Sequence, residues 1–225
     1  MTILKETSAL VVHSGGADST ICLHWALDQF KKVEAITFNY GQRHVIELEA
    51  AQKICELNNI PQKVVHINSF TDLGSNALTD NSVDIEFQKD KDLPNTFVPG
   101  RNLIFLTMAA AWAYQRGIQH LVTGVCQTDF SGYPDCRNET IQSLSKTISL
   151  GIDKPYTIHT PLMFIDKAES VRLASSLGAF ESLSYSHTCY EGQIPPCGKC
   201  PSCELRQKGF DEAGFKDPLL ERLQD

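Results

Sequence analysis

The feature that most constrains the fold of this chain is a glycine-containing run between an apolar stretch and a helical pattern. The apolar stretch covers residues 9–12, the run covers residues 14–20 (Ser-Gly-Gly-Ala-Asp-Ser-Thr), and the helical pattern covers residues 18–30. Glycine lets a backbone approach a ligand closely, and the first turn of a helix offers free N–H groups and the positive end of the helix dipole. A buried strand, a glycine turn and a helix start in this order predict a phosphate-binding loop.

The run departs from two familiar phosphate-binding motifs, because it has neither the lysine of GxxxxGK[ST] nor the glycine spacing of GxGxxG. It resembles instead the SGGxDS signature of the PP-loop ATP pyrophosphatases, which split ATP between its α and β phosphates and hold the pyrophosphate in this loop. An ordinary Gly-Gly turn, with Asp18 capping the following helix, is the alternative. The residues expected to contact ATP are His13, Ser14, Gly15, Gly16, Ala17, Asp18, Ser19, Thr20, Ile21, Cys22 and Leu23.

Strand patterns and helix patterns alternate along most of the chain. The expected strands cover residues 9–12, 33–38, 63–67, 120–125 and 157–160. The expected helices cover residues 18–30, 45–57, 101–116 and 137–150, with one more after a capping box at Asp166 and Glu169 and before Gly178. This alternation predicts a doubly wound, Rossmann-like α/β fold with a mostly parallel sheet, in which ligands bind beyond the carboxyl ends of the strands.

The stretch 68–100 interrupts this alternation, since it has no sustained periodicity and is rich in acidic residues between 80 and 92. A loop of this length in a compact domain is typical of a functional element or a mobile one. We expect a surface excursion, either a lid or a solvated insertion.

Length and charge limit the remaining possibilities. The 225 residues suffice for a nucleotide-binding domain, expected over residues 1–182, with a smaller segment over residues 183–225 packed on it. The net charge of -7 argues against a broad nucleic-acid surface. The apolar runs are too short for a membrane span, and the N-terminus is not a typical signal peptide. The sequence thus predicts a cytoplasmic protein that acts on small molecules, with no nucleic-acid or membrane partner.

Four of the eight cysteines are clustered near the C-terminus, as Cys189, Cys197, Cys200 and Cys203. Two C-x2-C spacings and four soft sulfur ligands suit one tetrahedral structural zinc ion. Lys199, Arg206 and Lys208 would offset the net negative charge of the four-thiolate zinc centre. An iron–sulfur cluster is the main alternative, and a disulfide pair is a weaker one in a cytosolic protein.

Several further segments occur in the order found in one family of PP-loop enzymes. They are residues 38–44 (FNYGQRH), 98–102 (VPGRN), 123–137 (TGVCQTDFSGYPDCR), 160–162 (TPL) with Lys167, and the cysteine-rich segment 188–206. Together with the first loop they cover nearly the whole chain, which resembles the family of 7-cyano-7-deazaguanine synthases of the queuosine pathway.

This resemblance implies a ligase that forms carbon–nitrogen bonds. ATP activates the carboxylate of 7-carboxy-7-deazaguanine as an adenylate, ammonia displaces AMP to give an amide, and a second ATP activates the amide so that loss of AMP leaves a nitrile. The resemblance also implies a zinc ion on the four clustered cysteines and a homodimer.

Roles are expected for two further groups of residues. The chemical steps are assigned to Asp18, Ser19, Arg101 and Lys167, with Mg²⁺ accompanying ATP and Asp18 as a candidate ligand for it. The deazapurine and its carboxylate are assigned to Asp129, Tyr133, Asp135 and Arg137. An aromatic face stacks on such a base and a carboxylate accepts from its N–H groups. For Arg101 and Arg137 the alternative role is a surface ion pair. For Asp129, Tyr133 and Asp135 the alternative is a polar surface loop.

Two other functions compete with this one. A PP-loop enzyme that thiolates tRNA would need a basic surface and a cysteine to carry sulfur, and the net charge and the clustering of the cysteines weigh against both. A zinc-binding interaction module on a degenerate nucleotide fold would not turn over ATP, and the intact residues Gly15, Gly16, Asp18 and Ser19 weigh against degeneration.

Overall fold

The computed structural model describes residues 4–42, 46–72, 77–78, 83, 93–128 and 132–224. Within them, five parallel strands form one sheet in the order β3-β2-β1-β4-β5. The strands are β1 (Leu4–Val12), β2 (Phe30–Asn39), β3 (Gln62–His66), β4 (His120–Val122) and β5 (Thr157–His159). The helices up to β5 are α1 (Ala17–Gln29), α2 (Ile46–Leu57), α3 (Ser69–Asp72), α4 (Arg101–Tyr114) and α5 (Asn138–Ile152), with a 3-10 turn, η1 (Pro134–Cys136), before α5. Four helices follow β5: α6 (Lys167–Ser176), α7 (Phe180–Leu183), α8 (Pro201–Ala213) and α9 (Pro218–Arg222).

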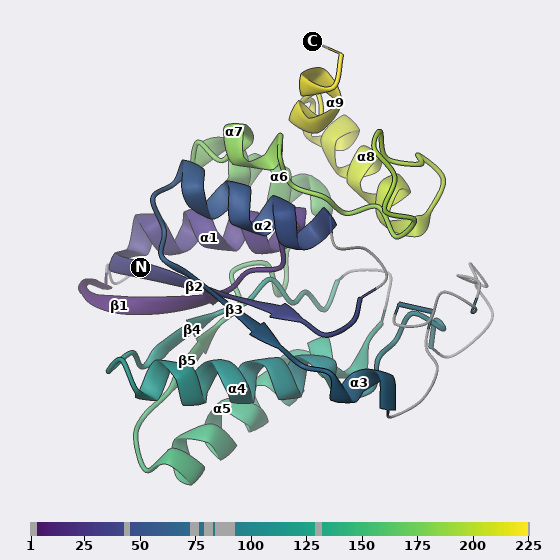
Figure 1. Cartoon of the computed structure of the whole chain (residues 1–225). Coiled ribbons are helices and arrows are strands. Elements are labelled where there is room, and N and C mark those ends of the chain that lie inside the picture. Colours follow the sequence, from purple (N-terminus) through teal and green to yellow (C-terminus); the bar gives the residue numbers. More distant parts are fainter. Residues whose placement is uncertain are drawn as a thin grey trace.

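Helices cover both faces of the sheet, with α1, α2 and α6 on one side and α4 and α5 on the other (Figure 1). The central strand β1 shows why, because its buried side chains alternate between two cores. Ala9 and Val11 pack with residues of α1 and α6, whereas Leu10 packs with residues of α4. The predicted doubly wound, parallel α/β fold is confirmed.

The ends of the elements differ from the expected ones where tertiary pairing decides them. β2 begins at Phe30 instead of Val33, because Phe30 pairs with Leu4 at the start of β1. β4 ends at Val122 instead of Val125, and residues 123–125 leave the sheet to line the cavity described below. The capping box before α6 is confirmed, since Asp166 accepts from the Glu169 N–H at 2.7 Å and Glu169 accepts from the Asp166 N–H at 2.8 Å.

The stretch 68–100 is described in part, and those parts are not a solvated excursion. Phe70, Ala77 and Val98 are all buried, and Phe70 and Val98 belong to the core on the α4 side of the sheet. The predicted lid depends on residues 73–76, 79–82 and 84–92, which lie outside the described residues.

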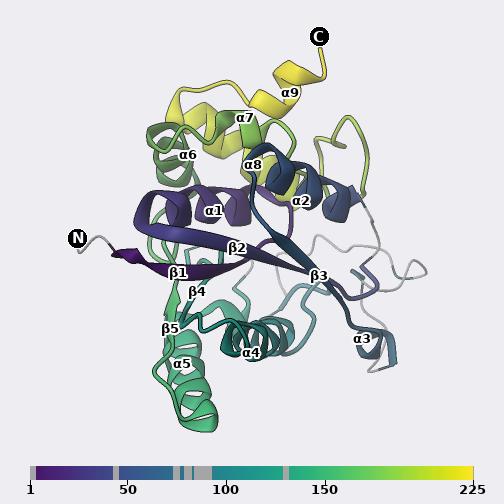
Figure 2. The ribbon, with the colours of Figure 1, turned by 60° about the vertical axis from the view of Figure 1, so that its left-hand side comes forward.

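Among the C-terminal helices, α8 packs against α6 and α9 packs against α7 (Figure 2). Arg206 of α8 is buried and forms a two-pronged ion pair with Asp217, at 2.6 and 2.9 Å, while it also donates to the Leu183 carbonyl. The expectation that Arg206 offsets the charge of a four-cysteine centre is therefore wrong, because its charge is already paired within the fold.

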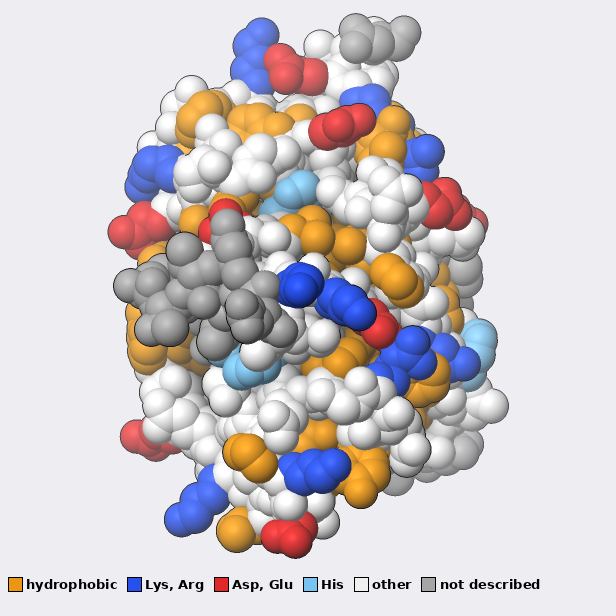
Figure 3. Space-filling model, turned by 90° about the vertical axis from the view of Figure 1, so that its left-hand side faces the viewer, with side chains coloured by type: hydrophobic (Ala, Val, Ile, Leu, Met, Phe, Trp, Pro, Cys, Tyr) orange, Lys and Arg blue, Asp and Glu red, His pale blue; other side chains and the backbone are white. Residues whose placement is uncertain are grey.

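The end of the molecule that carries the N-terminus has a mixed surface. Figure 3 shows basic, acidic and hydrophobic side chains interspersed there, and no field of one charge covers the coloured part of this face. In the part of the chain that the structure describes, no helix combines the length and the apolar character needed to cross a membrane.

Candidate active site

A cavity of about 300 Å³ opens beyond the carboxyl ends of β1, β2 and β4. This is where a doubly wound sheet binds its ligands. Its wall includes the segments that follow these strands, the start of α4 and residues 188–190. The lining residues from the predicted ATP loop are His13, Ser14, Gly16, Ala17, Asp18 and Ser19. Thr20, Ile21, Cys22 and Leu23 are instead buried, and the last three of them anchor α1 in the hydrophobic core.

Hydrogen bonds within the chain shape the loop between β1 and α1. Ser19 Oγ accepts from the Ser14 N–H at 3.1 Å and donates to the Gly16 carbonyl at 3.1 Å. Ser14 Oγ accepts from the Gly16 N–H at 3.3 Å and lies 3.1 Å from Ser19 Oγ. Two hydroxyls that can donate to a phosphate are thus already held in the cavity wall.

Glycine is required at Gly15 by its close contact with α2. Gly15 has a φ of +88°, and a Cβ there would overlap the Glu47 carbonyl oxygen and lie 2.7 Å from the Ala51 nitrogen. Gly124, which follows β4, also packs closely on the loop, since a Cβ would lie 3.0 Å from the backbone nitrogen of Ser19. The loop is therefore clamped between α2 and the segment after β4.

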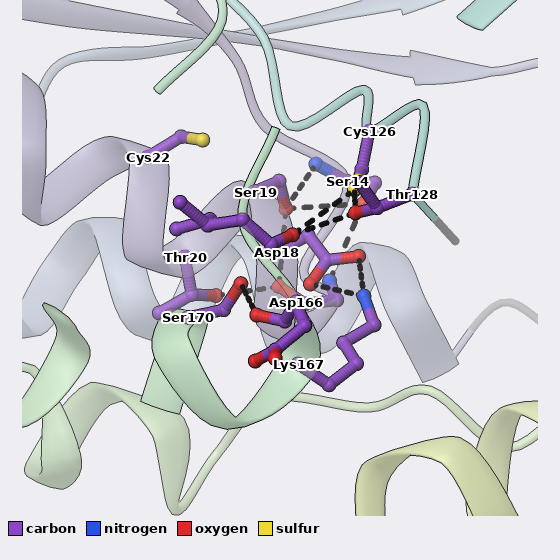
Figure 4. A network of polar contacts seen from close by, with 12 residues as sticks. Ser14, Asp18, Ser19, Thr20, Cys22, Cys126, Thr128, Asp166, Lys167 and Ser170 are labelled. Atoms are coloured by element: carbon purple, nitrogen blue, oxygen red, sulfur yellow. Dashed lines mark hydrogen bonds and ion pairs between the residues drawn. The ribbon is translucent and has the colours of Figure 1, made fainter. Parts of the chain in front are cut away.

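Asp18 pairs with Lys167 across the mouth of this loop (Figure 4). Lys167 Nζ donates to both carboxylate oxygens of Asp18, each at 2.7 Å. The interpretation of Asp18 as the cap of α1 is wrong, because Gly16 is the N-cap residue and Asp18 lies inside the first turn. Lys167 begins α6 near the positive end of that helix dipole, which is an unfavourable position for a cation. The carboxylate of Asp18 compensates the charge of Lys167 there.

Arg101 places a cation in the cavity wall at the start of α4. Its Nη1 donates to the Tyr40 hydroxyl at 3.3 Å, and the guanidinium lies 5.8 Å from the centre of the Tyr40 ring. Burial opposes the charge, but Tyr40, Tyr133 and Asp135 together raise the pKa of Arg101, so the group stays protonated. A fixed guanidinium that lines a cavity suits a carboxylate or a phosphate better than the surface ion pair considered above.

The four residues expected to bind the substrate do not all lie in the cavity. Tyr133 lines the cavity, and its hydroxyl lies 2.7 Å from that of Thr96. Asp135 is buried and accepts from the Asn102 N–H at 3.0 Å, so it ties η1 to the start of α4. Arg137 is exposed between η1 and α5, and Asp129 lies outside the described residues.

Glu47 is a cavity residue that the sequence did not single out. It lies in the first turn of α2, and burial raises its pKa to about 7 although Arg101 opposes the shift. The sequence did contain a signal for Glu47, because this residue comes soon after the segment 42–44 that follows β2. Residues that follow the carboxyl ends of the strands lie where a doubly wound sheet binds its ligand.

The four clustered cysteines come together as predicted. Their sulfur atoms all lie within 4.8 Å of one another, and those of Cys197 and Cys203 are 3.9 Å apart. Cys189 and Cys200 are almost fully buried. The group can therefore hold one metal ion between the cavity and α8.

Comparisons with known proteins agree with this geometry. A family model described as queuosine biosynthesis protein QueC matches residues 8–214. The chain is 58% identical to 7-cyano-7-deazaguanine synthase of Chromobacterium violaceum, over all of this chain and 97% of the relative. It is 50% identical to the synthase of the same name from Bacillus subtilis, over 93% of this chain and 96% of the relative.

Solved structures share the fold at low sequence identity. A 4-thiouridine synthetase in complex with RNA and ATP aligns with a TM-score of 0.51 and 18% identity, over 97% of this chain and 52% of that one. The U34-tRNA thiolase NcsA of Methanococcus maripaludis, with its [4Fe-4S] cluster, aligns with a TM-score of 0.50 and 18% identity, over 99% of this chain and 74% of that one. These likenesses support the PP-loop type of α/β fold.

Proposed function

The chain belongs to the family of queuosine biosynthesis protein QueC, and on this premise we propose that it makes 7-cyano-7-deazaguanine from 7-carboxy-7-deazaguanine and ammonia. The reaction uses two molecules of ATP and releases AMP and pyrophosphate from each. In class the enzyme is a ligase that forms carbon–nitrogen bonds. The observation that carries the proposal is the cavity that Arg101 lines together with the loop at residues 14–19, in which Asp18 is paired with Lys167.

The first half of the reaction forms an amide. A carboxylate oxygen of the substrate attacks the α phosphorus of ATP, and pyrophosphate leaves. Ammonia then attacks the acyl carbon, the bond to the AMP oxygen breaks, and a proton is lost. In this proposal Arg101 holds the carboxylate, while the loop N–H groups, Ser14 and Ser19 hold the departing pyrophosphate.

The second half removes the oxygen of the amide. The amide oxygen attacks a second ATP, pyrophosphate leaves again, and loss of AMP together with two protons from nitrogen leaves the nitrile. Lys167 supplies positive charge beside the loop in both halves, where negative charge develops on the phosphates. Asp18 would hold the Mg²⁺ that accompanies ATP, which frees Lys167 for the phosphates.

A structural zinc ion is the metal proposed for the cysteine cluster. Tetrahedral zinc with Zn–S bonds of about 2.3 Å separates its sulfur ligands by roughly 3.8 Å. The 3.9 Å between the sulfurs of Cys197 and Cys203 supports this choice. When bound, the ion would hold the segment around residues 189–203 together.

Several broader properties complete the proposal. We infer a nucleotide-binding domain over residues 1–182 with a metal-binding segment over residues 183–225, a homodimer, a cytoplasmic location, and small molecules as the only substrates. The net charge of -7 supports the last point.

The decisive experiment combines the purified protein with ATP, Mg²⁺, ammonium and 7-carboxy-7-deazaguanine, and follows AMP and the mass of the base. We expect two AMP for each nitrile formed, and accumulation of an adenylate without ammonium. AMP release without a new base product would leave the loop assignment standing and refute the substrate. No AMP from a folded, metal-loaded protein would refute both.

A further inference from the structure

The segment that carries the first metal ligand also forms part of the cavity wall. Thr188, Cys189 and Tyr190 all line the cavity. Just before them, the His187 N–H donates to the Gly15 carbonyl at 2.9 Å, so this segment is bound to the nucleotide loop. Residues 187–190 thus contain, in order, a contact with the nucleotide loop, a metal ligand and a tyrosine in the cavity wall.

Tyr190 is held at the junction of the metal cluster and the cavity. Cys189 is 1% exposed, and its sulfur accepts from the Cys197 N–H at 3.4 Å. The turn after Tyr190 is closed by the Gly192 N–H, which donates to the Cys189 carbonyl at 3.0 Å. A metal ion on Cys189 therefore fixes the backbone from which the Tyr190 ring projects.

The Tyr190 side chain reaches the residues that surround Arg101. Tyr190 lines the cavity together with Tyr133 and Arg101, and its side chain interacts with both. Tyr133 is itself fixed by Thr96 and by Phe97, whose ring centre lies 5.5 Å away. Together with Tyr40, these side chains place three phenol rings from three separate segments beside one guanidinium.

Such an arrangement suits a flat, polar base that carries a carboxylate. The rings offer faces and edges for a heteroaromatic plane, the hydroxyls offer hydrogen bonds to its edge, and the guanidinium pairs with the carboxylate. We propose that Tyr190 is a specificity-determining residue for the deazapurine, and that the metal on Cys189 positions it. This inference rests on the proposed function, because it takes the base from there.

The first test replaces Tyr190 in the metal-loaded protein. Binding of 7-carboxy-7-deazaguanine is measured by calorimetry with α,β-methylene-ATP present, alongside the KM values for base and ATP and the metal content. We expect Tyr190→Phe to weaken base binding roughly three- to tenfold, and Tyr190→Leu more, with the KM for ATP and the metal content unchanged. Tyr185→Phe is the matched control, because Tyr185 lies in the same segment but packs against Lys53 and Arg222.

The second test removes the metal, by chelation or by Cys189→Ser, and measures base binding without catalysis. We expect weaker binding of the base, with the analogue of ATP still bound as evidence that the fold persists. The inference is overturned if both Tyr190 variants bind the base as the parent does, if they lose base and ATP equally, or if the metal-free protein binds the base normally. A parent protein that neither binds nor converts the base would refute the proposed function instead.

Discussion

Lys167 Nζ lies 2.7 Å from each carboxylate oxygen of Asp18, so the first turn of α1 and the first turn of α6 are joined by one symmetrical ion pair. The two residues are 149 positions apart in the chain, and both side chains are only partly exposed, at 17% for Lys167 and 32% for Asp18. When ATP and Mg²⁺ bind, we expect the metal to replace Lys167 as the partner of Asp18 and a phosphate to replace Asp18 as the partner of Lys167.

The charge of Lys167 is therefore expected to matter for catalysis more than for stability. Lys167→Gln keeps much of the length and removes the charge, and we expect kcat to fall roughly 10²-fold, as for the loss of a donor to a developing anion. The free energy of unfolding should change by no more than about 1 kcal/mol, because the pair is partly solvated. Lys208→Gln is the control, since Lys208 is exposed and pairs only loosely with Glu212. Normal kcat in Lys167→Gln would remove the residue from the mechanism.

The position of Lys167 depends in turn on Gly209 of α8. A Cβ on Gly209 would lie 2.9 Å from the Cβ of Lys167 and 3.3 Å from its carbonyl carbon. Gly209→Ala should push α6 away from α8 and move the ammonium group, with a loss of activity of roughly tenfold or more and a destabilisation of about 1–3 kcal/mol. Steady-state kinetics and urea unfolding measure the two effects.

Gly151→Ala provides the comparison for that experiment. Gly151 lies in α5, and a Cβ there meets nothing within 4 Å. Alanine favours the helix, so this variant should be as stable as the parent or slightly more stable, with unchanged activity. If Gly209→Ala behaves in the same way, close packing of α8 does not position Lys167.

The parts of this site that were predictable are those with a local signal. The glycine loop and the cysteine spacing are contiguous patterns, and alternating apolar runs located every strand of the sheet. The partner of Asp18 had no such signal, because it comes from a helix 149 positions further along the chain. The local cap preference of aspartate suggested a different role, which the tertiary ion pair overrides. Tyr190 was within a recognised motif, but only the fold places its side chain beside Arg101.

Gly15 and Gly16 should respond very differently to the same substitution. Gly15→Ala places a Cβ against the backbone of α2 at a φ of +88°, and we expect a destabilisation of more than about 2 kcal/mol. Gly16 has an extended backbone, and its nearest neighbour would be Ser14 Oγ at 3.4 Å, so Gly16→Ala should cost less than about 1 kcal/mol. Urea unfolding of both variants gives the comparison, and equal losses would contradict the assigned contact with α2.

His13 should make the protein sensitive to acid. Burial lowers its pKa from 6.5 to about 4 in the folded state, so between these values the unfolded chain binds a proton that the folded chain does not. The stability that neutral His13 contributes is fully present above pH 6.5 and is lost as the pH falls toward 4. The slope of the free energy of unfolding against pH should include up to about 1.4 kcal/mol per pH unit from this residue.

Substitution isolates this contribution, because His159 has its own pKa lowered to about 4 and adds a similar slope in the same window. Urea unfolding at several pH values between 4.5 and 7 should show a flatter dependence for His13→Asn than for the parent, whatever the change in stability at pH 7. His66→Asn, at an exposed position of β3, is the matched control. An unchanged slope in His13→Asn would mean that His13 takes up its proton equally in the folded and unfolded chains.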